Sequence, residues 1–359
     1  MNLCDAQSEV KLLLNKVKPS ELHKLFNWIR TSDELDELLS DNRKVILRHI
    51  SDELRAALPP DAMLPSESTA YCKMQQRSRP TVHVDSFLYD EDQVDSLCEE
   101  GAFSRSYCLT CGSYKTAPLD FISHSFSISE LQFLFENVLP DLSGRLLVDV
   151  GSRLGAVLYG AHVFSSASQL VGVELSEEFV KLQNDIIRKY QLTDRIRVLH
   201  SDVCLQDALL QSADVLIMNN VFEFFMEPRE QVRAWRFIME NFRKKGSLLV
   251  TVPSLQESLS TLQVSHTHTH THTHTHTHTH THTHTLSNII FGYSEISGGQ
   301  TLETRTSFKH VISEPLPVCV PQEALQPGWV EELPVDYNVY LDRDTDPDAL
   351  RQIHLYRVI

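Results

Sequence analysis

The central part of the chain alternates short apolar runs with segments whose apolar positions recur at helical spacing. The apolar runs have the length of buried strands and cover residues 146–150, 170–173, 196–199, 215–218 and 247–252. The other segments predict helices over residues 156–164, 176–190 and 229–242. Short apolar strands that alternate with helices form parallel sheets covered on both faces. The pattern therefore predicts an α/β fold.

Regular patterns also flank this alternation. Ser127 and Glu130 have the spacing of a capping box, which predicts a helix over residues 127–139. On the C-terminal side a regular pattern returns at Trp329, and the alternating segment 352–359 predicts a terminal strand. These elements are placed to extend the same fold.

The first 126 residues divide into two parts. Residues 1–60 have apolar positions at helical spacing only, and a pair of prolines ends that pattern, which predicts an N-terminal helical bundle. Residues 61–126 are mixed, with an alternating strand pattern over 82–88 and a short acidic helix over 90–98. The N-terminal bundle could be a substrate lid, a docking unit for a partner or a packing element, and the pattern leaves these three roles open.

Composition narrows the classes of function. The 359-residue chain has a formal net charge of −16, which argues against binding nucleic acid through a broad basic surface but not against a local basic groove. No basic stretch leads into an apolar one at the N-terminus, and no apolar run approaches the roughly 18 residues of a membrane span. The seven cysteines lack regular spacing and indicate reduced thiols. We therefore expect a cytoplasmic or nuclear protein without a membrane segment.

Two features raise the question of metal binding. Cys108 and Cys111 form a C-x-x-C pair, but tetrahedral zinc needs four ligands and no second pair follows, so they are weak zinc candidates. Ten histidines alternate with threonine over residues 266–285, a pattern that a dinucleotide repeat in the coding sequence produces without selection. We expect no metal site. We expect residues 264–328 to form a loosely ordered insertion, because a polar repeat buries too little apolar surface to offset ordering entropy.

The candidate chemistry begins in the turn after the first central strand, where the sequence reads DVGSRLG. Gly151 and Gly155 allow the backbone to approach a ligand, and the helix that follows presents free N–H groups. Glu174 ends the next strand, where an acid commonly binds both ribose hydroxyls of an adenosine. Asp202 follows the third strand, where it could contact an adenine amino group or could simply cap the next element.

A dinucleotide is disfavoured as the ligand of this turn. The dinucleotide fingerprint requires glycine where this chain has Arg153, at the point of approach to the pyrophosphate. Asp149 lies two residues before Gly151 and would repel a pyrophosphate. An acid in this position suits a cationic cofactor that carries an amino group.

Residues 146–252 resemble class I S-adenosylmethionine-dependent methyltransferases. Asp149, Gly151 and Gly155 match the first motif of that family, D-x-G-x-G-x-G, which Arg153 interrupts. The resemblance implies S-adenosyl-L-methionine as the cofactor, methyl transfer as the activity, and a seven-stranded sheet that closes with an antiparallel strand beside the fifth.

The resemblance also assigns roles after the later strands. It implies that Glu174 binds the ribose and that Asp202 and Val203 contact the adenine. Asn219 matches the exit of the fourth strand, where the family lines the junction of methyl donor and acceptor. Glu223 follows closely and is the nearest candidate for a catalytic base, with Asn219 as a second catalytic candidate.

The resemblance implies a methyltransferase core made of residues 127–263 and 329–359, with residues 61–126 as a mixed region on the substrate side. It leaves the acceptor open, although the acidity favours a protein or a small molecule over nucleic acid, and the N-terminal helices favour a protein. The alternative is a non-catalytic, methyltransferase-like scaffold, because Arg153 could crowd the methionine end of the cofactor.

Overall fold

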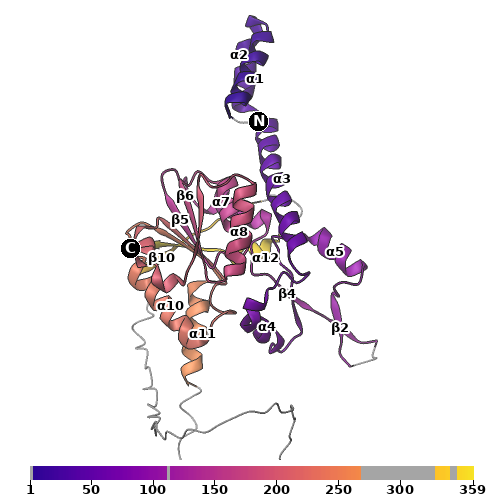
Figure 1. Ribbon diagram of the computed structural model, residues 1–359, viewed down its shortest axis with the longest axis vertical. Helices are drawn as coiled ribbons and strands as arrows, with labels where there is room; N and C mark the ends of the chain where they lie inside the picture. The colour runs from indigo at the N-terminus through magenta and orange to yellow at the C-terminus, as the bar shows by residue number, and fades with distance from the viewer. Residues whose placement is uncertain (1–2, 111–113, 268–327, 340–345) are drawn as a thin grey trace, which may run out of the picture.

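The fold is built around a seven-stranded sheet (Figure 1). The computed structural model describes residues 3–110, 114–267, 328–339 and 346–359. The strands of the sheet are β5 (Leu146–Val150), β6 (Gln169–Glu174), β7 (Ile196–His200), β8 (Val215–Asn219), β9 (Leu248–Val252), β10 (Val330–Leu333) and β11 (His354–Val358). Their order is β10-β11-β9-β8-β5-β6-β7.

Strands β5 to β9 are parallel, and β11 lies antiparallel between β9 and β10. This arrangement confirms the predicted α/β class and the seven-stranded sheet. The five central strands follow the apolar runs of the sequence, and the alternating segment 352–359 contains β11.

Alternate residues of each strand enter two separate cores. Leu147 of β5 and Ile217 of β8 belong to the core beneath α6, α7 and α8, whereas Val148 and Leu216 belong to the core beneath α9, α10 and α11. These helices are α6 (Ile128–Phe133), α7 (Ala156–Phe164), α8 (Glu177–Lys189), α9 (Asp207–Ser212), α10 (Pro228–Asn241) and α11 (Leu255–Thr267). Because both faces are covered, the strands can be apolar throughout. Among the described helices, none has both the length and the apolar content needed to cross a bilayer.

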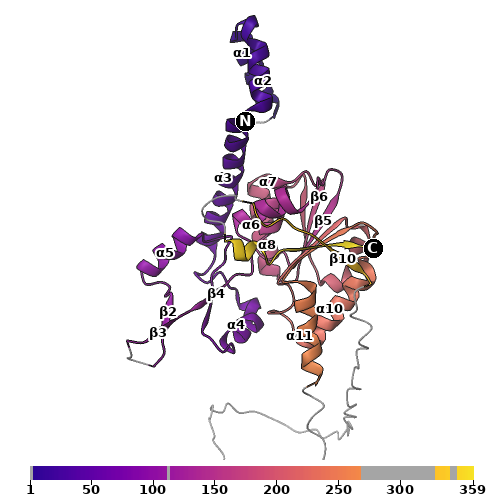
Figure 2. The ribbon, with the colours of Figure 1, turned by 180° about the vertical axis from the view of Figure 1, so that it is seen from behind.

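Three helices form the N-terminal region, and they are α1 (Leu3–Lys16), α2 (Pro19–Thr31) and α3 (Asp33–Ala57). The region is helical, as the sequence predicts, but it differs from a compact bundle. All thirteen residues of α2 are described and none is buried, and α1 and α2 extend away from the sheet (Figures 1 and 2). Leu47, Ile50 and Leu54 of α3 are buried in the core shared with α6 and α7. The second half of α3 therefore packs against the domain.

In the 61–126 region, as we call residues 61–126, the described residues form short elements. They are the 3₁₀ turn η1 (Pro65–Glu67), α4 (Ser68–Gln75), β1 (Thr81–His83), α5 (Glu91–Glu99), β2 (Ser106–Cys108), β3 (Thr116–Pro118) and β4 (Asp120–Ile122). The strands pair in two separate two-stranded sheets, β1 with β4 and β2 with β3. The acidic helix predicted over 90–98 is α5, which Asp90 caps.

The strand predicted over residues 82–88 is shorter than its alternating pattern suggests, because β1 ends at His83. Asp85 causes this difference. Its Oδ1 accepts hydrogen bonds from the N–H groups of Phe87, at 3.0 Å, and Leu88, at 3.3 Å, which folds the backbone into a turn.

Candidate functional site

The turn between β5 and α7 contains three residues in the left-handed region, with φ of 68° at Gly151, 43° at Arg153 and 85° at Gly155. A Cβ atom on Gly151 would lie 3.0 Å from Cγ1 of Val221, and one on Gly155 would lie 2.7 Å from the Tyr159 ring. Both glycines are therefore required by conformation and by space. Arg153 takes up the same backbone region with a large side chain, which costs about 1–3 kcal/mol unless other contacts offset it.

A cavity of about 280 Å³ lies at the carboxyl ends of β5, β6, β7 and β8, and we call it the first cavity. Five of the predicted cofactor-binding residues line it, and they are Gly151, Glu174, Asp202, Val203 and Asn219. Asp149 and Gly155 shape the turn beside it and are absent from the described lining. The strand order thus brings together residues that are up to 68 positions apart in the sequence, a span measured from Gly151 to Asn219.

Glu174 presents a fixed carboxylate to the first cavity and is 8% exposed. Its Oε2 accepts a hydrogen bond from the N–H of Arg153 at 2.8 Å, and its Oε1 accepts one from the N–H of Ser176 at 2.7 Å. Burial raises the pKa of Glu174, although these hydrogen bonds oppose the rise. Burial and the nearby Glu174 also raise the pKa of Asp149 well above its usual range.

Asp202 has a structural role as well as a place in the cavity wall. Its Oδ1 accepts a hydrogen bond from the N–H of Cys204 at 2.8 Å and so caps the 3₁₀ turn η3 (Val203–Leu205). The capping interpretation of the sequence therefore describes a contact that exists. It does not replace the other interpretation, because the same residue lines the first cavity.

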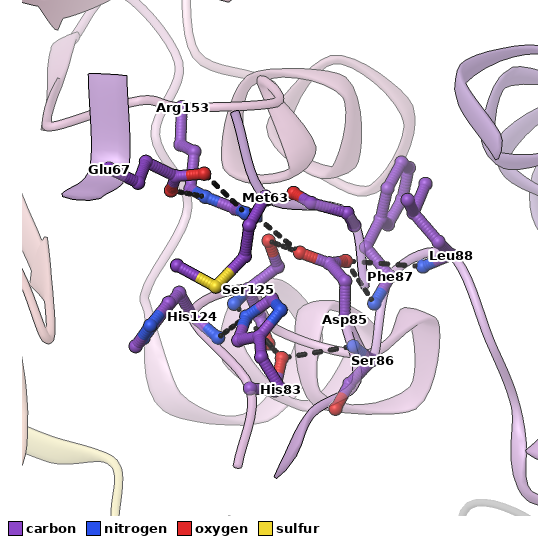
Figure 3. A network of polar contacts seen from close by, with 12 residues as sticks. Met63, Glu67, His83, Asp85, Ser86, Phe87, Leu88, His124, Ser125 and Arg153 are labelled. Carbon is purple, nitrogen blue, oxygen red and sulfur yellow. Dashed lines mark hydrogen bonds and ion pairs between the residues drawn. The ribbon is translucent and has the colours of Figure 1, made fainter. Parts of the chain in front are cut away.

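The side chain of Arg153 is 6% exposed and runs into the 61–126 region (Figure 3). Its Nε lies 2.6 Å from Oε1 of Glu67, and its Nη1 lies 2.6 Å from Oδ2 of Asp85. Its Nη2 donates a hydrogen bond to the carbonyl oxygen of Ala62 at 2.5 Å. The guanidinium is thus paired with two carboxylates, a contact that no motif in the sequence indicated.

The 61–126 region supplies a second wall of the first cavity, through Ser66, Glu67, Thr69 and His124. Sequence patterns did not place any of these four residues at a cofactor site. The one usable signal was the arginine that interrupts the glycine motif, because a charged residue at a buried turn requires buried partners of opposite charge.

His124 is a buried imidazole in this second wall and is 6% exposed. Among the described residues, neither of its ring nitrogens has a hydrogen-bond partner. Its ring stacks on that of His83, with centroids 4.5 Å apart, and lies 4.9 Å from the rings of both Phe224 and Phe225. Burial, followed by the charges of His83 and of Arg153, lowers the pKa of His124 well below its usual value. The ring is therefore neutral at neutral pH.

A second cavity, of about 420 Å³, adjoins the first at Asn219, which lines both. Glu223 lines the second cavity together with Arg77, Ser125 and Glu130. In the described chain Glu223 is absent from the lining of the first cavity. The two predicted catalytic residues, Asn219 and Glu223, thus meet at the second cavity.

Within the described ranges, no three His, Cys, Asp or Glu side chains are grouped so that they could hold a metal ion. Cys108 is exposed at the end of β2. Cys111, its proposed companion, and residues 268–285 of the histidine–threonine tract lie outside the described residues.

Residues 148–250 match the model of a protein family described as a methyltransferase domain. The comparison with curated proteins gave no match. The matched residues run from β5 to β9 and include the turn and the strand ends that form the first cavity. The sequence resemblance is therefore confirmed for this part of the chain.

Three solved structures are similar to part of this chain. The RNA methyltransferase from Salinibacter ruber, in complex with S-adenosyl-L-homocysteine, is 17% identical, with 35% of this chain and 73% of that chain covered and a TM-score of 0.28. The geranyl diphosphate C-methyltransferase from Streptomyces coelicolor A3(2) is 18% identical, with 34% and 44% covered and a TM-score of 0.28. The [4+2]-cyclase SpnF is 23% identical, with 35% and 43% covered and a TM-score of 0.27. This chain spans less than half the length of the last two proteins, and the family assignment rests on the match over residues 148–250.

Proposed function

We propose that this chain, which contains a class I S-adenosylmethionine-dependent methyltransferase domain, transfers a methyl group to an acceptor that enters the second cavity. The observation that carries the proposal is the meeting of Glu174, Asp202 and Asn219 at the first cavity, beside the glycine turn. When bound, S-adenosylmethionine supplies an electrophilic methyl group on a sulfonium. The protein's own contribution is alignment and exclusion of water.

The residues at the first cavity fit the chemistry of this cofactor. The carboxylate of Glu174 accepts hydrogen bonds from the N–H groups of Arg153 and Ser176, and its oxygens would also accept hydrogen bonds from the paired hydroxyls of a ribose. Asp202 and Val203 combine a carboxylate with an apolar side chain, which suits the amino edge and the face of an adenine. Gly151 lines the first cavity without a side chain, which permits close approach of the cofactor to the backbone.

The second cavity supports the acceptor side of the proposal. Asn219 lines both cavities and is thus placed where donor and acceptor would meet. Glu223 would take up the proton that an N–H or O–H acceptor releases on methylation. At this cavity the carboxyl groups of Glu130 and Glu223 outnumber the guanidinium of Arg77, and together with the net charge of −16 they disfavour phosphate groups. We therefore propose a protein side chain as the acceptor.

A non-catalytic scaffold is the second candidate function, and Arg153 is the observation that favours it. An arginine that only ties the turn to Glu67 and Asp85 would keep the domain folded without any need for a cofactor. The orientation of its side chain opposes this candidate in one respect: the guanidinium is paired with Glu67 and Asp85, as Figure 3 shows, and is therefore not free to crowd a cofactor.

Calorimetric titration of the full chain with S-adenosylhomocysteine separates the two candidates. The methyltransferase proposal expects saturable binding at one site. A folded chain that does not bind S-adenosylhomocysteine would contradict this proposal and favour the non-catalytic scaffold. Incubation with methyl-labelled S-adenosylmethionine and separate protein, RNA and metabolite fractions then tests the acceptor class. Label in the protein fraction is expected, and label confined to RNA or metabolites would contradict the proposed acceptor.

A further inference from the structure

Arg153 connects the carboxylate at the first cavity to the 61–126 region. Its backbone N–H holds Oε2 of Glu174, and its side chain pairs with Glu67 and Asp85. The backbone of Arg153 is in the left-handed region, which is strained for a residue with a side chain. This one residue therefore links its N–H group, at Glu174, to its guanidinium, in the 61–126 region. A movement of the 61–126 region would therefore move the N–H group that orients Glu174.

A second contact at the same junction repeats this arrangement. The N–H of Ser176 holds the other oxygen of Glu174, and the hydroxyl of Ser176 donates to Oγ of Ser66 at 3.2 Å. Two of the residues whose backbone orients the Glu174 carboxylate thus also contact the 61–126 region. The orientation of this carboxylate depends on the docked position of that region.

The pairing with Arg153 is specific because it is buried. Asp85 is 0% exposed, Glu67 is 5% exposed and Arg153 is 6% exposed. If one partner is displaced, an uncompensated charge stays in a site from which water is excluded, so the group of charges favours one geometry. Oδ2 of Asp85 also accepts a hydrogen bond from the hydroxyl of Ser125 at 2.7 Å, next to His124.

We propose that Arg153 is a positioning residue that couples occupancy of the first cavity by S-adenosylmethionine to docking of the 61–126 region. The inference rests on the proposed function for the identity of the ligand. Binding at Glu174 stabilises the orientation that Arg153 and Ser176 impose, and with it the position of Ser66, Glu67 and the segment around Asp85. The region that carries Ser125 and lines the second cavity is thereby set in place together with the cofactor.

Amide hydrogen exchange tests the coupling directly, with S-adenosylhomocysteine as the probe. The N–H groups of Phe87 and Leu88 are held by Asp85, and neither residue lines the first cavity within the described chain. Coupling predicts that saturating probe slows exchange at these two amides as well as at the cavity wall. Slower exchange confined to residues that line the cavity would overturn the proposal.

Asp85→Asn is the informative variant, because Asp85 contacts Arg153 but is absent from the described lining of the first cavity. We expect its affinity for S-adenosylhomocysteine to fall about tenfold or more, measured by calorimetry on protein whose fold is verified by circular dichroism. Arg153→Lys should retain more affinity than Arg153→Met, because it keeps the charge. Arg105→Met is the matched control, since it removes two exposed ion pairs, with Glu91 and Asp95, in the same region. It should bind as wild type does.

The outcomes separate the coupling from the proposed function. A wild-type chain that fails to bind the probe contradicts the proposed function, and the coupling with it. A wild-type chain that binds, with Asp85→Asn folded and within about twofold of its affinity, contradicts the coupling alone. If Asp85→Asn does not fold, Ser66→Ala removes the second contact mildly, and exchange at Phe87 and Leu88 in wild type still decides the question.

Discussion

The first cavity has two walls, and they differ in whether buried ion pairs help to hold them in place. The wall formed by the ends of β6, β7 and β8 belongs to strands whose apolar side chains fill two cores. The wall formed by the 61–126 region also buries apolar side chains, among them Phe87 and Leu88, but it depends in addition on the buried ion pairs of Arg153 with Glu67 and Asp85. Apolar burial is non-directional and follows from a repeating pattern, whereas an ion pair requires two particular residues. The wall formed by the strands is thus compatible with many sequences, whereas the ion pairs of the other wall require Arg153, Glu67 and Asp85.

The largest effect that this comparison predicts is on the stability of Arg153→Met. The change leaves two carboxylates buried without their cation, so we expect the free energy of unfolding to fall by about 3–5 kcal/mol. Urea unfolding followed by fluorescence measures it. Arg188→Met is the control, because its partner Asp185 and Arg188 itself are both exposed, and it should cost less than about 1 kcal/mol.

A triple variant sharpens the same prediction. Combining Arg153→Met with Glu67→Gln and Asp85→Asn removes the charges together, so most of the lost stability should return. A triple variant that is less stable than Arg153→Met would contradict the view that uncompensated charge, rather than lost packing, causes the loss.

The second effect concerns the wall formed by the strands. We expect Glu174→Ala to weaken S-adenosylhomocysteine binding by about 1.5–3 kcal/mol, because charged hydrogen bonds to the ribose are lost. Calorimetry measures this loss, with Glu178→Ala, an exposed acid on the adjoining α8, as the matched control. An unchanged isotherm for folded Glu174→Ala would remove this residue from the site.

The two walls also differ in what the sequence could predict. The apolar runs located the strands of the sheet, and motif positions after those strands placed Glu174, Asp202 and Asn219 at one cavity. Neither the hydrophobic periodicity nor a motif located the wall formed by the 61–126 region, because Arg153 pairs with residues 86 and 68 positions away in the sequence. Such pairings leave no local pattern.

The predictions that the structure corrects concern residues outside the wall formed by the strands. The strand expected over 82–88 ends at His83 because Asp85 folds the next residues into a turn, a side-chain contact that overrides the alternating pattern. The bundle expected over 1–60 was inferred from amphipathic spacing alone. That spacing does not say which partner covers the apolar face, and in α2 no residue is buried.

The third prediction uses pH to probe the polar wall. Burial, followed by His83, Arg153 and Arg77, lowers the pKa of His124, so the folded state keeps it neutral while an unfolded histidine gains a proton near pH 6.5. The unfolded state then binds more protons, and stability is lost as the pH falls below about 6.5. The slope contributed by His124 should reach at most about 1.4 kcal/mol per pH unit.

His124→Phe tests this contribution, because phenylalanine retains the aromatic contacts with Phe224 and Phe225. Between pH 7 and pH 5 the melting temperature of this variant should fall less than that of wild type. His49→Phe serves as the control for the exchange of a histidine for a phenylalanine, because His49 is exposed. Equal slopes for wild type and His124→Phe would show that His124 does not titrate differently in the folded state.

The smallest effect is expected where neither kind of wall is involved. The sequence predicts that the insertion at residues 264–328, with its histidine–threonine repeat, contributes little to the fold, because such a composition buries little apolar surface. The cost of closing a loop grows only slowly with its length, so a shorter connection is compatible with the same sheet. Replacing residues 268–327 by a glycine–serine linker should keep S-adenosylhomocysteine affinity within about twofold and the melting temperature within about 2 °C. The linker would join α11 to β10 directly, and both elements belong to the described fold. A replacement variant that aggregates or loses binding would mean that part of this segment completes the domain, and that the cavity has a contributor beyond its two walls.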